Sequence, residues 1–137
     1  MKPIAIGQVG RFTITPGFEH TAEALGNTGV AVVSTPHLIG FLEMAAHDVM
    51  LAHLEPGEAS VGTRVAVEHL AAAFPGRRVD GEAIAHDIDG ERVTFEVVAR
   101  QGQRVVMRGT HQRAAVRLDR FLRRLQEQAQ VSELPPG

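Results

Sequence analysis

The segment 36–53 constrains the fold of this 137-residue chain more than any other part of the sequence. Its apolar residues recur on nearly every side of a helix, a pattern that is typical of a helix buried in a protein core. Ser34, Thr35 and Pro36 stand at its start, and a hydroxyl residue followed by proline predicts an N-cap with proline at the first helical position. The segment ends at Leu54-Glu55-Pro56-Gly57, a helix stop. Other elements must therefore cover this helix.

Alternation of apolar and polar residues predicts strands in much of the remaining chain. We expect one strand before the helix, over 9–15, and four after it, over 59–74, 78–88, 92–100 and 103–118. The later four are separated by hairpin-type signals, which predict an antiparallel meander: Pro75-Gly76, Asp89-Gly90 and Gln101-Gly102. A basic amphipathic helix is predicted over 117–130.

The simplest arrangement of these elements is an α+β fold in which a curved antiparallel sheet wraps a long central helix. Such a sheet leaves one side of the helix and one sheet edge uncovered, which favours a dimer. We expect the whole chain, 1–137, to form a single domain with a flexible tail over 130–137.

The composition narrows the class of protein. Hydrophobic residues make up 44% and charged residues 22%, the balance of a soluble globular protein. Because there is no cysteine, disulfides, thiolate metal sites and cysteine nucleophiles are excluded. The net charge of −2 and the lack of Trp and Tyr argue against nucleic-acid binding. No window approaches the ~20 apolar residues of a membrane span and no signal-peptide core is present, so we expect no membrane partner and a cytoplasmic location.

Glu43 stands in the middle of the predicted buried helix. A buried carboxylate costs several kcal/mol unless it has a partner or a proton, so it is a candidate for function. The alternative is a structural acid that caps, pairs with a distant arginine or lies on an exposed part of the helix. His47 follows on the same helical face, but the pattern His-Glu-x-x-His is missing, and we predict no metal site.

Thr35 precedes Glu43 by a little over two helical turns, ~12 Å along the axis. The free N–H groups of the helix start could polarise a carbonyl beside it; alternatively, Thr35 is only an N-cap worth ~1 kcal/mol. His69 shares a strand face with two valines and is a candidate general acid or base, or a structural histidine. Gly62, within the same strand, indicates a bulge or the close approach of a ligand.

The other histidines have no comparable context, and we interpret them as surface or turn residues: His20, His37, His53, His86 and His111.

Three sequence blocks carry a resemblance to a known family. They are Thr35-Pro36-x-Leu38-x-x-x-Leu42-Glu43-x-Ala45-Ala46, then Leu54-Glu55-Pro56-Gly57-Glu58-x-Ser60-Val61-Gly62-Thr63-x-Val65-x-Val67-x-His69-Leu70-Ala71, then Gly109-Thr110-His111-x-Arg113. In this order and spacing they resemble the hot-dog thioesterases related to fluoroacetyl-CoA thioesterase, over residues 7 to 125.

The resemblance implies a hot-dog fold, a homodimer that could pair into a tetramer, and hydrolysis of a small acyl-CoA thioester. CoA would enter only as part of the substrate, with no other cofactor. The family's catalytic set falls on Thr35, Glu43 and His69, and its substrate-contacting glycine and arginine fall on Gly62 and Arg113. The residues alone would give Arg113 only a surface or interface ion pair.

The mechanism that this set implies uses backbone N–H groups at the helix start and at Gly62 to hold the thioester oxygen. His69 would act as the base and then as the acid toward the thiolate, and Glu43 would orient His69 or the water. Thr35 would either attack or position the water. Because hot-dog sites are usually built at the subunit interface, Glu43 and His69 could come from different chains.

Two alternatives use the same fold: a non-catalytic acyl-CoA-binding module, and an enoyl-thioester hydratase, for which no aspartate partner of His69 is visible. The segment 26–33 also lacks an aromatic residue that could close over a tiny acyl group. Fluoroacetyl selectivity is therefore not implied, and a larger acyl chain could be admitted.

Overall fold

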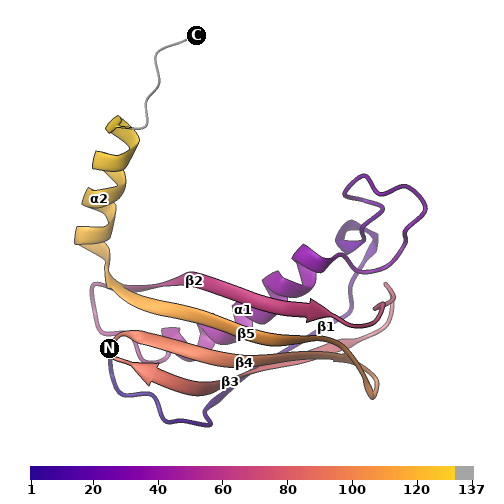
Figure 1. Cartoon of the computed structure of the whole chain (residues 1–137), viewed down its shortest axis with the longest axis horizontal. Coiled ribbons are helices and arrows are strands. Elements are labelled where there is room, and N and C mark those ends of the chain that lie inside the picture. Colours follow the sequence, from indigo (N-terminus) through magenta and orange to yellow (C-terminus); the bar gives the residue numbers. More distant parts are fainter. Residues whose placement is uncertain (132–137) are drawn as a thin grey trace.

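In the computed structural model, which describes residues 1–131, one long helix lies across a five-stranded antiparallel sheet (Figure 1). The elements are β1 (Val9–Ile14), the short 3-10 helix η1 (Phe18–His20), α1 (Thr35–Leu51), β2 (Glu58–His69), β3 (Val79–Asp89), β4 (Arg92–Gln101), β5 (Arg104–Arg117) and α2 (Leu118–Val131). This is the predicted α+β arrangement, a central helix against a curved sheet. The predicted tail, 130–137, lies outside the described residues except for the end of α2.

The strand order in the sheet is β1-β3-β4-β5-β2, so β2 and β3 are not neighbours and the hairpin predicted between them is absent. The hairpins at Gly90 and Gly102 are confirmed, and their positive φ angles of 61° and 62° fit turns with glycine at the first central position. Pro75-Gly76 is no hairpin, because β2 pairs with β5 and β3 pairs with β1. The strand predicted over 59–74 ends at His69, because the residues after it leave the β2 edge and lead to β3, which lies beside β1 near the opposite edge.

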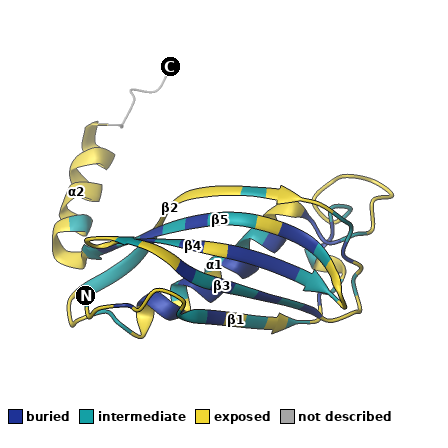
Figure 2. Cartoon of the chain, turned by 60° about the horizontal axis from the view of Figure 1, so that its bottom comes forward, coloured by how far each residue is buried: buried dark blue, intermediate teal, exposed yellow. Residues whose placement is uncertain are grey.

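The core lies between one face of α1 and the inner face of the sheet (Figure 2). Leu38, Leu42 and Met50 are buried there. Met44 and Leu51 are exposed by 63% and 57%, which agrees with the prediction that the sheet covers only one side of the helix. One side of α1 is therefore left open within a single chain.

The predicted C-terminal helix, α2, extends away from the sheet and has no buried residue (Figures 1 and 2). In the described part of the chain, no helix combines the length and the apolar character needed to cross a bilayer.

Candidate active site

The start of α1 supplies the first part of the site. Ser34, not Thr35, is the N-cap: its Oγ accepts a hydrogen bond from the N–H of His37 at 3.2 Å and lies 2.5 Å from Nδ1 of the same histidine. The sequence prediction of the cap was wrong by one residue. The correction matters because Thr35, at the first helical position, keeps its hydroxyl group free for another partner.

The Thr35 hydroxyl is hydrogen-bonded to Nδ1 of His69 at 2.7 Å, and both side chains are exposed. The helix start is fixed by a 2.8 Å hydrogen bond from the N–H of Val33 to the carbonyl of Ala73. At the helix start, Pro36 has no N–H and the N–H of His37 donates to the Ser34 cap. The N–H of Thr35 therefore remains available, with no partner among residues 1–131. A hydroxyl, an imidazole and a free N–H thus meet at the positive end of a helix.

A β-bulge decides which residues of β2 face α1. The register of β2 against β5 shifts between Gly62 and Arg64, so Thr63 is an extra residue in the strand. Its hydroxyl donates to the carbonyl of Gln112 at 3.1 Å, which fixes the bulge. Side chains alternate along a strand, and the extra residue therefore lets Gly62 before the bulge and His69 after it lie on the same face.

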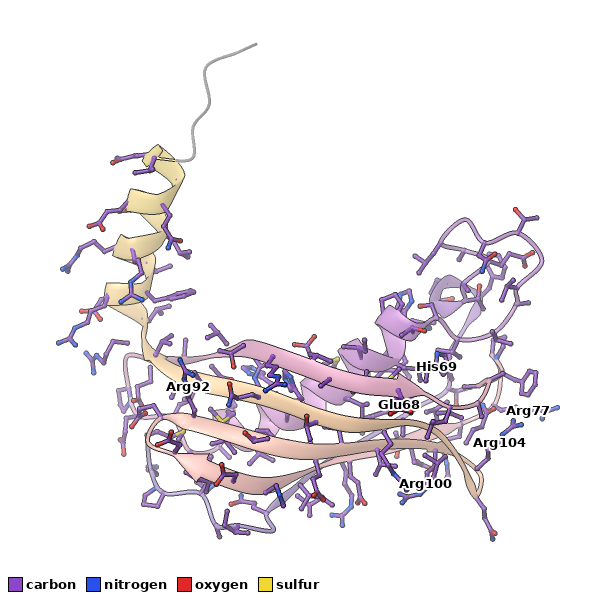
Figure 3. All side chains as sticks on the ribbon, viewed as in Figure 1. Glu68, His69, Arg77, Arg92, Arg100 and Arg104 are labelled. Carbon is purple, nitrogen blue, oxygen red and sulfur yellow. The ribbon has the colours of Figure 1, made fainter. Side chains whose placement is uncertain are left out.

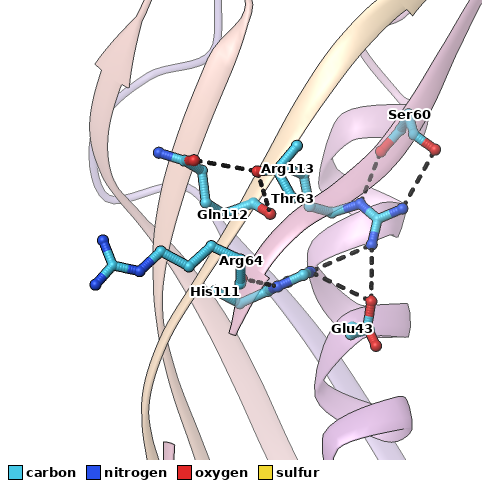
Figure 4. A network of polar contacts seen from close by, with 7 residues as sticks. All are labelled: Glu43, Ser60, Thr63, Arg64, His111, Gln112 and Arg113. Carbon is cyan, nitrogen blue, oxygen red and sulfur yellow. Dashed lines mark hydrogen bonds and ion pairs between the residues drawn. The ribbon is translucent and has the colours of Figure 1, made fainter. Parts of the chain in front are cut away.

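Glu43 and Arg113 form the second part of the site. Glu43 projects from the third turn of α1, and its side chain is 39% exposed. Nη1 of Arg113, on β5, lies 3.4 Å from Oε2 of Glu43. The guanidinium is held from its other side by Ser60, because Nε donates to the serine Oγ at 2.8 Å and Nη2 donates to its carbonyl at 3.3 Å (Figure 4).

His111 completes this cluster and corrects its prediction as a surface or turn residue, since it is only 2% exposed. Its Nδ1 lies 2.9 Å from the carbonyl of Arg64, which can only accept, so Nδ1 carries the proton. In the neutral ring Nε2 then accepts from Nη1 of Arg113 at 3.2 Å (Figure 4). Glu43 lies 3.8 Å from the same Nε2, too far for a hydrogen bond.

Burial sets the electrostatics of the cluster. Desolvation lowers the pKa of His111 below its ordinary value, while the carbonyl of Arg64 and the charge of Glu43 act in the opposite direction. Desolvation also lowers the pKa of Arg113, against the opposing charge of Glu43. A neutral His111, a cationic Arg113 and an anionic Glu43 give a cluster with almost no net charge.

Gly62 leaves room for the carboxylate. A Cβ atom at this position would lie 3.0 Å from Oε2 of Glu43 and 3.3 Å from Nη1 of Arg113. Any side chain would therefore press on the ion pair, which accounts for glycine in this strand.

Within one chain the five predicted residues form two groups rather than one. Thr35 and His69 meet at one end of β2, and Glu43, Gly62 and Arg113 meet further along it. Gly62 and His69 are seven residues apart, ~20 Å along an extended strand. In the single chain Glu43 is paired with Arg113 and not with His69.

A narrow apolar cleft lies between α1 and the sheet beside the second group. Its walls include Ile39, Leu42, Val65 and Val67, and Glu43 and His111 form its polar end. In the single chain this cleft leaves no room for a water molecule.

Two residues of the second group were missed by the sequence predictions, Ser60 and His111. His111 alternates with Arg113 on one strand face and stands in the block that carries the family resemblance, which was the available signal. Ser60 likewise stands in a block that carries the resemblance, two residues before Gly62 on the same strand. His47, considered as a metal ligand, has a buried Nδ1 without a partner, and no three His, Asp or Glu side chains within residues 1–131 could share a metal ion.

Solved structures identify the fold class. The hot-dog-like protein from Thermanaerovibrio acidaminovorans superposes with a TM-score of 0.84 over 90% of this chain and 91% of that chain, at 24% identity. The fluoroacetyl-CoA thioesterase FlK superposes with a TM-score of 0.83 over 92% of this chain and 98% of that chain, at 29% identity. The chain has the hot-dog fold.

The family is more specific than the fold. The chain belongs to the family described as fluoroacetyl-CoA-specific thioesterase, whose model matches residues 17–119. The fluoroacetyl-CoA thioesterase of Streptantibioticus cattleyicolor is 38% identical over 90 residues, which are 66% of this chain and 65% of that relative's length. Variants of FlK have been solved with acetyl-CoA and with fluoroacetate and CoA.

Proposed function

We propose that this protein hydrolyses small acyl-CoA thioesters to the free acid and CoA. The observation that carries the proposal is the 2.7 Å contact between the Thr35 hydroxyl and His69 at the free end of α1. Membership of the fluoroacetyl-CoA-specific thioesterase family and the acyl ligands bound by the relatives support it.

The proposed reaction uses the groups at the helix start. His69 takes a proton from the attacking oxygen, which belongs to water or to Thr35, as that oxygen adds to the thioester carbonyl. The N–H of Thr35 and the helix dipole stabilise the negative oxygen that results. When the C–S bond breaks, His69 returns the proton to the CoA thiolate; if Thr35 has attacked, water then hydrolyses the ester. The proposed reaction needs no cofactor beyond the CoA of the substrate. We also propose a cytoplasmic location, where acyl-CoA substrates would be available.

We propose that two copies of the chain build each complete site. β2 is an edge strand of twelve residues, one side of which pairs with no strand of the described chain, and an edge of this length is a template for another strand. If two β2 strands pair antiparallel about a twofold axis near Val65, the midpoint between Gly62 and His69, the two groups of one chain face the complementary groups of the other. Glu43 would then stand beside the partner copy's Thr35–His69 pair and orient its imidazole or the attacking water.

The oligomeric state tests this part of the proposal. Light scattering should give the mass of a dimer, or of a tetramer made from two dimers. Val65→Lys should shift the mass toward the monomer, because Val65 is already 41% exposed in the single chain and the charge would lie at the axis. An inactive but still dimeric Val65→Lys protein would argue against pairing through β2.

We propose further that the acyl group is not restricted to fluoroacetyl. The segment 26–33 carries no aromatic ring, and Val30 within it is 38% exposed. A series of acyl-CoA thioesters of increasing chain length should show comparable or higher kcat/KM for propionyl than for acetyl; a sharp optimum at fluoroacetyl would contradict this.

Release of free CoA, measured with a thiol reagent, tests the activity itself. Glu43→Gln and His69→Asn should each lower kcat by ~10² or more if both groups act in catalysis. Binding of acyl-CoA with no release of CoA would instead identify a binding module. Full turnover in both variants would refute the proposed site.

A further inference from the structure

Two arginines near His69 have no acidic partner among residues 1–131. The neighbouring Arg78 and Arg100 are each close to a carboxylate, at 3.2 Å and 3.8 Å. By contrast, in the part of the chain that the structure describes, Arg77 and Arg104 make no ion pair, although the chain as a whole is slightly acidic. Free positive charge on an acidic chain indicates a local anion preference.

Both guanidinium groups are held on one aromatic ring. The guanidinium carbon of Arg77 lies 5.3 Å from the centre of the Phe74 ring, and that of Arg104 lies 5.6 Å from it. These are cation–π distances, which restrict the two long side chains. The ring itself remains 38% exposed, so one aromatic surface and two cations face solvent together.

The loop that carries Phe74 and Arg77 is bound to the end of β4, and Arg104 is the first residue of β5. The side chain of Gln101 accepts from the N–H of Phe74 at 2.8 Å and donates to the carbonyl groups of Phe74 and Arg77 at 2.9 and 3.1 Å. The arginine–phenylalanine group is therefore held in place on the end of β4, which lowers the entropic cost of binding a ligand.

The group lies beside the proposed catalytic groups. Phe74 follows His69 by five residues, a span of at most ~18 Å. Its neighbour Ala73 binds Val33, two residues before Thr35. Figure 3 shows Arg77 and Arg104 at the same end of the molecule as His69.

We propose that Arg77 and Arg104, held by Phe74, bind the phosphorylated nucleotide end of a CoA thioester whose carbonyl lies at Thr35 and His69; this inference rests on the proposed function. The nucleotide of CoA carries a diphosphate and a 3′-phosphate, and guanidinium groups bind phosphate through paired hydrogen bonds. In this pose the pantetheine arm would run between the two places.

The test compares two substrates that share one acyl group, an acyl-CoA and the matching S-acyl-pantetheine. In Arg77→Ala/Arg104→Ala the KM for acyl-CoA should rise about tenfold or more, with kcat within about twofold, because charge-assisted hydrogen bonds to phosphate are lost. The KM for S-acyl-pantetheine should not change. The matched control is Arg11→Ala, an exposed arginine on β1 at the opposite edge of the sheet, which should leave both values unchanged.

Equal changes for the two substrates, or no change for either, would overturn the assignment. If the wild-type protein hydrolyses neither substrate, the proposed function fails, and calorimetry with CoA and pantetheine tests the site separately. Weaker binding of CoA alone in the double variant supports the site, and unchanged CoA binding overturns it.

Discussion

Gly62→Ala tests whether the position of Glu43 limits activity. The added Cβ would lie 3.0 Å from the glutamate Oε2 and 3.3 Å from Nη1 of Arg113, which is closer than most such contacts. Something must yield by a few tenths of an ångström. The carboxylate is the nearest group and moves most, because its side chain is 39% exposed whereas that of Arg113 is 9% exposed and held by Ser60. The third contact, Cε1 of the buried His111 at 3.3 Å, needs only a small adjustment.

The expected size of the effect follows from this geometry. A displacement of about 1 Å in a catalytic constellation can cost ~10²-fold, so a smaller displacement of Glu43 should lower kcat/KM about tenfold. Stability should change by less than about 1 kcal/mol. The carboxylate can turn toward solvent, and replacing glycine by alanine reduces the entropy of the unfolded chain by a compensating amount.

The assay is steady-state release of CoA together with a thermal melt for each variant. Glu43→Gln gives the loss expected when the carboxylate is absent, and Gly62→Ala should fall between it and the wild type. Gly40→Ala, on α1, is the matched control because an added Cβ there meets no atom within 4 Å. It should keep its activity and gain stability of up to about 1 kcal/mol, as expected for alanine in a helix.

Full activity in Gly62→Ala, with an unchanged melting temperature, would refute the reasoning. It would mean that Glu43 does not need the position that Gly62 leaves open. A large loss of stability would also contradict it, because the contact would then strain the backbone rather than move a side chain.

Three further predictions concern single residues. Thr35→Ala should lower kcat at least tenfold while Thr35→Ser retains most of it, because the hydroxyl bonded to His69 is what matters; equal losses in CoA release would contradict this role. Ser34→Ala should cost about 1 kcal/mol of unfolding free energy, measured by denaturant titration, because it removes the N-cap; a change below 0.3 kcal/mol, on the order of a surface substitution, would argue against it. Since burial lowers the pKa of His111, the unfolded chain takes up a proton before the folded one as the pH falls below about 6.5, and unfolding free energy should fall by at most about 1.4 kcal/mol per pH unit. Melts at pH 7.5 and 5.5 should show a smaller drop for His111→Gln, and an equal drop would show that His111 does not contribute.

The local elements could be predicted from the sequence because they depend on neighbouring residues. The apolar pattern gave α1, and Gly90 and Gly102 marked two turns correctly. The pairing of β2 with β5 could not be predicted from local patterns. Alternation of apolar and polar residues indicates which face of the sheet a side chain lies on, but not which distant strand is the neighbour. Pro75-Gly76 has the residues of a hairpin turn, but it lies in the longer connection from β2 to β3, which are not neighbours in the sheet.

The candidate site shows the same division. Glu43 was conspicuous as a charge within an apolar helix, and Gly62 as a gap in an alternating strand. The burial of His111 depends on the layers around it, and the sequence around it is polar. That Glu43 and His69 lie apart in one chain depends on the path of β2, which periodicity does not describe.

The bulge at Thr63 restricts how the length of β2 can change through evolution. Without the extra residue, the strand after it would present its opposite face to α1. His69 would then point away from Thr35, and Val65 and Val67 would no longer line the cleft between the sheet and α1. An insertion or deletion of two residues would leave His69 on the face toward α1, whereas one of a single residue would move it to the opposite face. Among relatives that keep both groups of the site, the spacing between the positions of Gly62 and His69 should therefore vary only in even steps.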